Sequence, residues 1–305
     1  YSEINTEYVN SERSLNELVL NFSQEEKESL WQSLLKAAQS NGKNSYYNIL
    51  SHNCTALPLR LLEENTAGTI CWAKEDADET YRSFCNQCLQ IHPWSRFLLN
   101  ISLGRTTDRP ITYRESFFLP RNLEKGLLSA NVVNSPEDVH PLIAGSHYLV
   151  SPVEKNVTAP FFTPLLCGWL LLAIVLIVSG IEWKHKRPLR WIDALLFGVA
   201  GIGGLYLFYI QFMAIQWFSS PSWWILWLHP LHLLAAVLSG IKRFDRLAAY
   251  YHTLNLAALI VMSAGLLVIP QYCDPAFVPL ILLLALRSVI RMALWKKSKK
   301  IDTSF

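Results

Sequence analysis

The chain has 305 residues, of which 51% are hydrophobic, and its 27 Lys and Arg against 24 Asp and Glu give a formal net charge of +3. The charge is unevenly spread: residues 1–155 carry a net charge of −5, and residues 156–305 carry +8, mostly in three basic clusters between long apolar runs. This pattern is typical of a membrane protein, so the small positive net charge does not indicate a nucleic-acid-binding surface.

The first 151 residues predict one α+β domain. Ser23 and Glu26 have the spacing of a capping box, and apolar residues then recur at helical intervals until Asn41 and Gly42, which predicts a helix. Residues 95–104 (SRFLLNISLG) and 111–119 (ITYRESFFL) are predicted to be β-prone or mixed segments on either side of a turn. Residues 152–160 predict a linker, and residues 161–305 a membrane domain.

Cys54 precedes a predicted helix over residues 55–64, in which Pro58 fits the first turn. If Cys54 opens this helix, the first-turn N–H groups and the helix dipole favour its thiolate form. The residues alone leave three interpretations open: a nucleophile, a buried small hydrophobe, or half of a disulfide.

The other five cysteines are predicted to have structural roles and not catalytic ones. Cys85 and Cys88 form a CxxC spacing, but without a second ligand pair a disulfide among Cys71, Cys85 and Cys88 is favoured over a metal site. Cys167 and Cys273 lie in or beside apolar runs and are predicted to be packing residues.

Five apolar runs in the second half are long enough to span a bilayer, which takes about 20 residues each. The runs are residues 161–181, 194–217, 223–241, 247–269 and 276–294. Arg287 and Arg291 share one face near the end of the fifth run and are predicted to reach toward lipid headgroups as topology anchors. His229 and His232, one turn apart, predict packing or interfacial hydrogen bonds.

The loops between these runs predict the orientation. Residues 183–190, 242–246 and 296–300 are basic, whereas residues 219–222 and 271–275 hold no Lys or Arg. Because Lys and Arg near span ends stay in the cytoplasm, residues 1–155 are predicted to lie outside it and the C-terminus inside it. The chain begins at Tyr1 without a secretory leader, and we expect further residues upstream.

Several stretches together carry a family resemblance. Residues 18–38 (LVLNFSQEEKESLWQSLLKAA) and 45–64 (SYYNILSHNCTALPLRLLEE) resemble the helix and Asn-Cys element of the Lnb family, the lipoprotein N-acyltransferases of Bacteroidetes. Residues 92–133 resemble the closing segment of that family's periplasmic domain, and the stretch SPSWWILWLHPLHLL resembles the Trp- and Pro-bearing motif of its membrane part.

The resemblance implies a fold and an activity. The fold would be an incomplete α+β papain-like domain of the permuted NlpC type in the periplasm, followed by an all-α membrane domain of about five helices in the bacterial inner membrane. Cys54 would take an acyl chain from a membrane phospholipid as a thioester and pass it to the α-amine of a diacylated lipoprotein. The mechanism requires no cofactor and no metal.

The sequence departs from the family pattern near Cys54. Relatives carry a general-base histidine in an upstream Gly-His segment that this chain does not contain, so the base is expected upstream of Tyr1. His52 is favoured as a surface or capping residue over a base, Asn53 as a helix cap over an oxyanion donor, and Arg60 as a solvated residue over a headgroup ligand.

Two other functions stay open at this point. One is a membrane-anchored cysteine peptidase or amidase that acts on the cell wall, which is the commonest chemistry of papain-like relatives. The other is a non-catalytic membrane adaptor in which Cys54 is structural.

Overall fold

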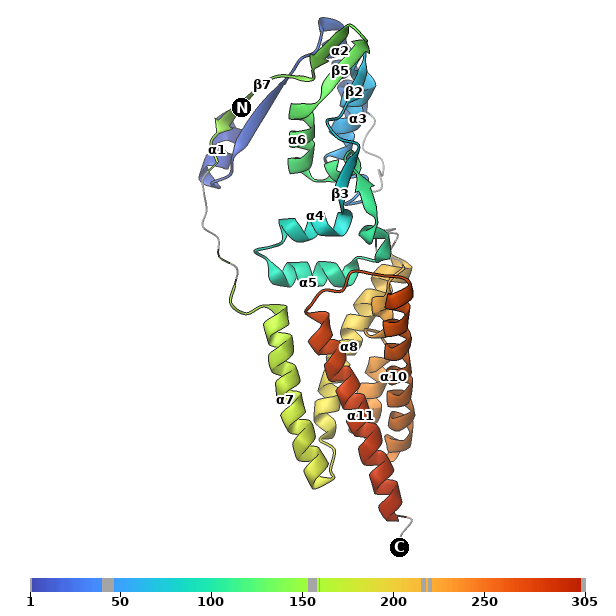
Figure 1. The fold of residues 1–305 in the computed structure, drawn as a ribbon. Helices are drawn as coiled ribbons and strands as arrows, with labels where there is room; N and C mark the ends of the chain where they lie inside the picture. The colour runs from blue at the N-terminus through green and yellow to red at the C-terminus, as the bar shows by residue number, and fades with distance from the viewer. Residues whose placement is uncertain are drawn as a thin grey trace. The chain divides into compact units, whose positions relative to one another are not determined.

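The computed structural model describes residues 2–39, 47–152, 158, 160–214, 218 and 221–302. The chain folds into two compact units (Figure 1), one formed by Tyr1–Phe84 with Pro110–Val157 and the other by Cys85–Arg109 with Thr158–Phe305. The two units are therefore interleaved in the sequence. Residues 85–109 belong to the second unit, whereas the division into 1–151, 152–160 and 161–305 places them in the first domain.

The first unit combines helices with three small antiparallel sheets. Its sheets have the strand orders β1-β7, β2-β5-β6 and β3-β4. The strands are β1 (Leu15–Leu20), β2 (Thr69–Cys71), β3 (Asp76–Thr80), β4 (Pro110–Thr112), β5 (Asn131–Ser135), β6 (Asp138–Pro141) and β7 (Ile143–Val150). The helices are α1 (Ser2–Asn10), α2 (Gln24–Gln39), α3 (Ala56–Asn65) and α6 (Pro120–Ser129), and α4 (Tyr81–Cys88) continues into the second unit. The prediction of a mixed helix and strand domain is confirmed.

The capping box that predicted α2 is present. The Ser23 N–H donates to Glu26 Oε2 at 2.8 Å, and the Glu26 N–H donates to Ser23 Oγ at 3.2 Å, so two N–H groups at the start of the helix are satisfied. The predicted helix is confirmed, while its expected end at Asn41 and Gly42 lies outside the described residues.

The prediction of a β-prone or mixed segment at 95–104 is wrong, because residues 95–102 lie in α5 (Pro93–Ser102). Pro93 occupies the start of the helix, where its missing N–H costs nothing. Phe97 and Ile101, four residues apart, both pack into the core of the second unit. In the other segment, β4 is followed by a 3-10 helix over Glu115–Phe118, which agrees with a mixed segment.

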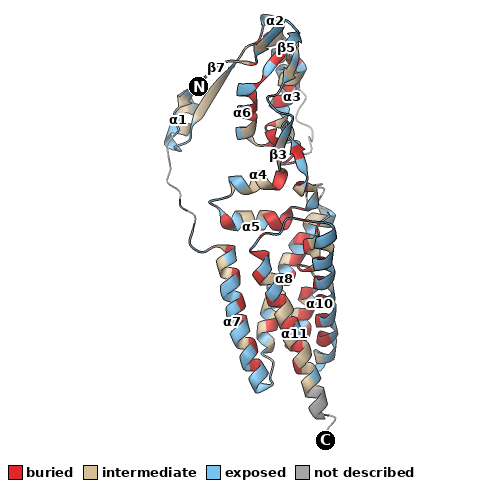
Figure 2. Ribbon diagram, viewed as in Figure 1, coloured by how far each residue is buried: buried red, intermediate tan, exposed pale blue. Residues whose placement is uncertain are grey.

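The second unit contains four helices that are long and apolar enough to cross a membrane, among the residues that were described. They are α7 (Pro164–His185), α8 (Arg190–Phe208), α10 (Asp245–Val268) and α11 (Phe277–Asp302), and α11 packs against both α7 and α10 (Figure 1). Figure 2 shows exposed and buried residues along each of these helices. The exposed residues include large apolar ones such as Ile177, Leu254 and Ile260, as lipid-facing surfaces require.

The third apolar run does not form one long helix. A short 3-10 helix (Trp223–Leu226) is followed by α9 (His232–Gly240), which has only nine residues. Pro230 lies between them. In a continuous helix its nitrogen, which has no hydrogen, could not donate to Leu226 O, and its ring would clash with that carbonyl. Residues 223–241 are therefore not one continuous helix, while the prediction of a helical membrane domain is confirmed.

Glycines of α8 let the segment around α9 approach closely. A Cβ at Gly201 would lie 2.6 Å from Leu233 N, and a Cβ at Gly204 would overlap the backbone of His229. Small residues at such positions are a common means of packing helices in membranes.

Candidate functional site

Cys54 lies at the start of α3 with its side chain exposed and its thiol free. Asn53 Oδ1 accepts the Thr55 N–H at 3.1 Å and the Ala56 N–H at 3.2 Å, which are capping contacts of α3. Asn53 Nδ2 donates to Ile49 O at 3.0 Å and to Phe118 O at 2.7 Å. Both amide hydrogens are thus engaged, so Asn53 holds the turn that leads into α3 and has no hydrogen left for an oxyanion.

The loop before Cys54 is fixed by its own hydrogen bonds. Asn48 Oδ1 accepts the N–H groups of Leu50 and Ser51, and Asn48 also pairs with His52 through backbone hydrogen bonds of 3.1 and 2.9 Å. Asn48 and Leu50 are buried, so the loop is anchored in the unit. Cys54 is therefore held in one place relative to α3.

The other two residues singled out near Cys54 lie in solvent. The ring of His52 is exposed, with Nδ1 3.1 Å from Ser51 Oγ. Arg60 forms an exposed ion pair with Glu64, with 3.6 Å between Arg60 Nε and Glu64 Oε1. Both arrangements agree with the surface roles favoured from the sequence.

Cys54 lines a pocket of about 380 Å³ within the first unit. Thr55 and Pro58 continue its wall along the first turn of α3. A second wall is one face of α6, formed by Pro120, Leu123, Glu124 and Leu127. This helical spacing places one carboxylate on a face that is otherwise apolar.

The third wall of the pocket comes from the β1/β7 pair. Asn16 and Leu18 of β1 and Tyr148 of β7 line it, together with Ser14. Asn16 Nδ2 donates to Glu124 Oε1 at 2.6 Å, and Ser146 Oγ donates to Asn16 Oδ1 at 3.2 Å. Sequence reasoning missed this polar wall; the signal that could have found it is the acidic residue within the apolar face of the helix over 120–129.

The predicted disulfide is absent. Cys71 and Cys88 both have free thiols, and any disulfide within the set Cys71, Cys85 and Cys88 would involve one of them, so that prediction is wrong. Among the residues that the structure describes, no group of three or more His, Cys, Asp or Glu side chains is placed to hold a metal ion.

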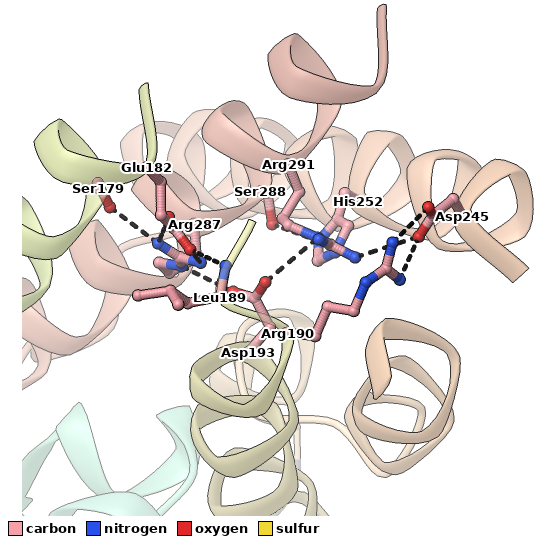
Figure 3. Close-up of polar contacts among 10 residues, drawn as sticks. All are labelled: Ser179, Glu182, Leu189, Arg190, Asp193, Asp245, His252, Arg287, Ser288 and Arg291. Atoms are coloured by element: carbon pink, nitrogen blue, oxygen red, sulfur yellow. Dashed lines mark hydrogen bonds and ion pairs between the residues drawn. The ribbon is translucent and has the colours of Figure 1, made fainter. Parts of the chain in front are cut away.

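A second polar cluster lies inside the helical unit, and Figure 3 shows its contacts. Arg287 on α11 is fully buried and pairs with Glu182 on α7, with Asp193 Oδ1 on α8 at 2.7 Å, and with Ser179 Oγ at 2.9 Å. The expected reach of Arg287 toward lipid headgroups is therefore wrong. An arginine this far from water requires carboxylate partners, which the neighbouring helices provide.

Arg291 extends the same cluster (Figure 3). Its Nε lies 3.2 Å from Asp193 Oδ2 and its Nη2 lies 3.6 Å from Asp245 Oδ1 on α10. Arg190 on α8 forms a bidentate pair with Asp245, with both contacts at 2.6 Å. Three arginines and three carboxylates thus join four helices, and the predicted headgroup contact of Arg291 is also wrong.

His229 and His232 take the packing role predicted for them. Their rings stack with centroids 4.0 Å apart. His232 is buried, and its two ring nitrogens contact Trp227 O at 2.9 Å and the Tyr251 hydroxyl at 2.7 Å.

Comparison with known families gives two matches. A family model described as the Lnb N-terminal periplasmic domain matches residues 1–87, and one described as the Lnb transmembrane domain matches residues 155–299. No curated protein and no solved structure matches the chain. Cys54 and its loop lie within the first match, and the four candidate spans lie within the second.

Proposed function

The chain belongs to the Lnb family, and from this membership we propose that it is a lipoprotein N-acyltransferase whose nucleophile is Cys54. The family's two domains suggest a membrane protein that processes lipoproteins, with an N-terminal periplasmic domain and a multi-pass helical domain. The finer proposal adds the reaction, the residue that carries it, and the bacterial inner membrane with a cytoplasmic C-terminus as its location.

One observation carries this proposal. The exposed thiol of Cys54 lies at the start of α3 and lines a pocket whose walls include Leu18, Leu123 and Leu127. A free and exposed thiol speaks against Cys54 as a buried hydrophobe or as half of a disulfide. An apolar wall beside a nucleophile suits a fatty acyl group better than a polar cell-wall peptide.

The proposed reaction has two steps. The Cys54 thiol gives up its proton as its sulfur attacks the ester carbonyl of a phospholipid, the C–S bond forms and the C–O bond breaks, and the lysophospholipid leaves with that proton on its oxygen. The α-amine of a diacylglyceryl-cysteine then attacks the thioester, the C–N bond forms and the C–S bond breaks, which restores Cys54. The Cys54 backbone N–H would donate to the oxyanion in each step.

The membrane helices fit this chemistry, since both substrates are lipids. A site at the outer face of the inner membrane takes the acyl chain from one lipid to another without extracting it into water, where each exposed methylene costs about 0.8 kcal/mol.

The proposal is tested by intact-protein mass spectrometry of protein purified from native membranes and incubated with phospholipid vesicles. We expect a hydroxylamine-labile fatty acyl mass on the wild type and on Cys71→Ser, a matched control with another exposed free thiol, and no such mass on Cys54→Ser. Absence of the adduct from the wild type would overturn the proposal. Cleavage of a cell-wall peptide by that protein would then assign it to the peptidase class.

A further inference from the structure

The pocket around Cys54 contains a carboxylate that the two-step reaction above does not use. Glu124 is half-buried on α6, between Leu123 and Leu127, which are themselves buried in the core of the first unit. This packing fixes α6, so the Glu124 side chain remains on the face that lines the pocket.

Asn16 and Ser146 orient the Glu124 carboxylate. A carboxylate only accepts hydrogen bonds, so the Asn16 amide must turn its NH₂ group toward Glu124, and its oxygen then faces Ser146. The contacts of 2.6 Å to Glu124 Oε1 and 3.2 Å from Ser146 Oγ satisfy both ends of the amide. The second carboxylate oxygen, Oε2, is left for a ligand in the pocket.

No cation among the described residues balances the charge of Glu124. Four other glutamates of the first unit each pair with a basic side chain. They are Glu7 with Arg13, Glu17 with His147, Glu63 with Arg114, and Glu64 with Arg60. Within the described part of the chain, Glu124 pairs with no cation, and its pocket is lined by no Lys, Arg or His. A half-buried carboxylate in such a setting attracts a positively charged group and repels a phosphate.

We propose that Glu124 binds a primary ammonium group next to Cys54, an inference that rests on the proposed acyl transfer. Two groups share this chemistry: the α-amine of the lipoprotein acceptor and the amine of an ethanolamine headgroup on the donor lipid. The α-amine is the group that must meet the thioester, and the carboxylate and the nucleophile line one pocket.

The transfer step balances with Glu124 in this role. The ammonium carries three protons, of which the amide product keeps one. Glu124 takes one proton before the nitrogen attacks the thioester carbon and passes it to solvent. The other goes to the Cys54 sulfur as the C–S bond breaks.

The test compares Glu124→Gln with the wild type in the two half-reactions separately. Glutamine keeps an oxygen for the Asn16 hydrogen bond and removes only the charge. We expect thioester formation from phosphatidylglycerol vesicles at the wild-type rate. Single-turnover transfer to a diacylglyceryl-cysteine peptide should be at least about tenfold slower, with a raised KM, which corresponds to about 1.4 kcal/mol.

Two further variants separate a charge effect from a structural one. Glu124→Asp keeps the charge and should recover part of the transfer rate, whereas Glu64→Gln, an exposed glutamate of the same unit, should leave both half-reactions unchanged. A loss confined to thioester formation from phosphatidylethanolamine would identify the ethanolamine amine as the ligand. Unchanged transfer and unchanged thioester formation in Glu124→Gln would overturn the inference.

A binding measurement keeps this inference distinct from the acyltransferase proposal. In nanodiscs, Cys54→Ser protein should bind hexylammonium at least about tenfold more tightly than the Cys54→Ser/Glu124→Gln protein does, while hexanol binds both equally. This result does not require any thioester. Equal affinity of the two proteins for hexylammonium would refute ammonium binding even if wild-type protein transfers acyl chains.

Discussion

Replacement of Arg287 by methionine should strongly destabilise the helical unit. Arg287 is fully buried and contacts Glu182 on α7, Asp193 on α8 and Ser179 on α7, so its removal leaves buried carboxylates without their main cation. Breaking a buried ion pair by removal of one partner costs about 3 to 5 kcal/mol, largely because the remaining charge has lost its compensation. We expect a loss of that size in the free energy of unfolding.

The structure also indicates how to reverse most of this loss. In the wild type, Arg190, Arg287 and Arg291 balance Glu182, Asp193 and Asp245. Arg287→Met leaves one excess negative charge, and the added substitution Glu182→Gln removes it while the glutamine oxygen can still accept the Leu189 N–H. The double variant should therefore be within about 2 kcal/mol of the wild type, since an apolar replacement of a whole buried pair is often nearly neutral.

The assay is reversible unfolding in mixed micelles of rising SDS mole fraction, followed by tryptophan fluorescence from the 11 tryptophans of the chain. Arg60→Met removes an arginine from an exposed pair and should change stability by no more than about 0.5 kcal/mol. The reasoning is refuted if Arg287→Met costs less than about 1 kcal/mol, or if the double variant is no more stable than Arg287→Met alone.

Three further predictions concern the first unit. Asn53→Ala should lower the free energy of unfolding by about 0.5 to 2 kcal/mol, measured by thermal unfolding, and should slow thioester formation, measured by mass spectrometry. An unchanged rate of thioester formation would show that the Asn53 contacts at the start of α3 do not affect catalysis. Gly126→Ala should cost about 1 to 3 kcal/mol, because a Cβ there would lie 2.5 Å from Phe117 Cζ; an unchanged melting temperature would show that the ring moves aside. Partial burial disfavours the charged form of Glu26, but hydrogen bonds, led by the Ala67 N–H, outweigh it and lower its pKa below the ordinary value of 4.5. The ionised Glu26 therefore stabilises the folded protein at pH values above 4.5, and this stabilisation is lost as the pH falls through the lowered folded-state pKa. Glu26→Gln should flatten the acid side of the stability profile, measured by thermal unfolding between pH 3 and 6.

Local patterns predicted the elements whose determinants are local. The capping box of Ser23 and Glu26 predicted α2, and the position of Cys54 before an apolar repeat predicted α3. The apolar runs predicted a membrane domain because a bilayer sets both length and composition. In contrast, the short apolar run of α5 fits a helix or a strand equally well in sequence, and Pro93 is its local signal for a helix start.

Features that depend on distant partners could not be predicted. Arg287 and Arg291 were visible as charges in an apolar run, but their partners Glu182, Asp193 and Asp245 belong to other helices, and sequence spacing says nothing about which helices meet. The pocket has the same property. Cys54 lies in a contiguous sequence motif, but the rest of the pocket lining comes from three other parts of the chain, at residues 14–18, 120–127 and 148.

The polar wall of that pocket depends on the register of β1 against β7. Asn16 is paired with Tyr148, and Leu18 with Ser146, while Glu17 is paired with His147. Because side chains alternate along a strand, a slip of one residue would turn Asn16 away from the pocket and bring Glu17 in. The contact of 2.7 Å between Glu17 and His147 on the opposite face opposes such a slip. An exposed pair far from the nucleophile in sequence thus helps to keep Asn16, and not a second carboxylate, beside Glu124.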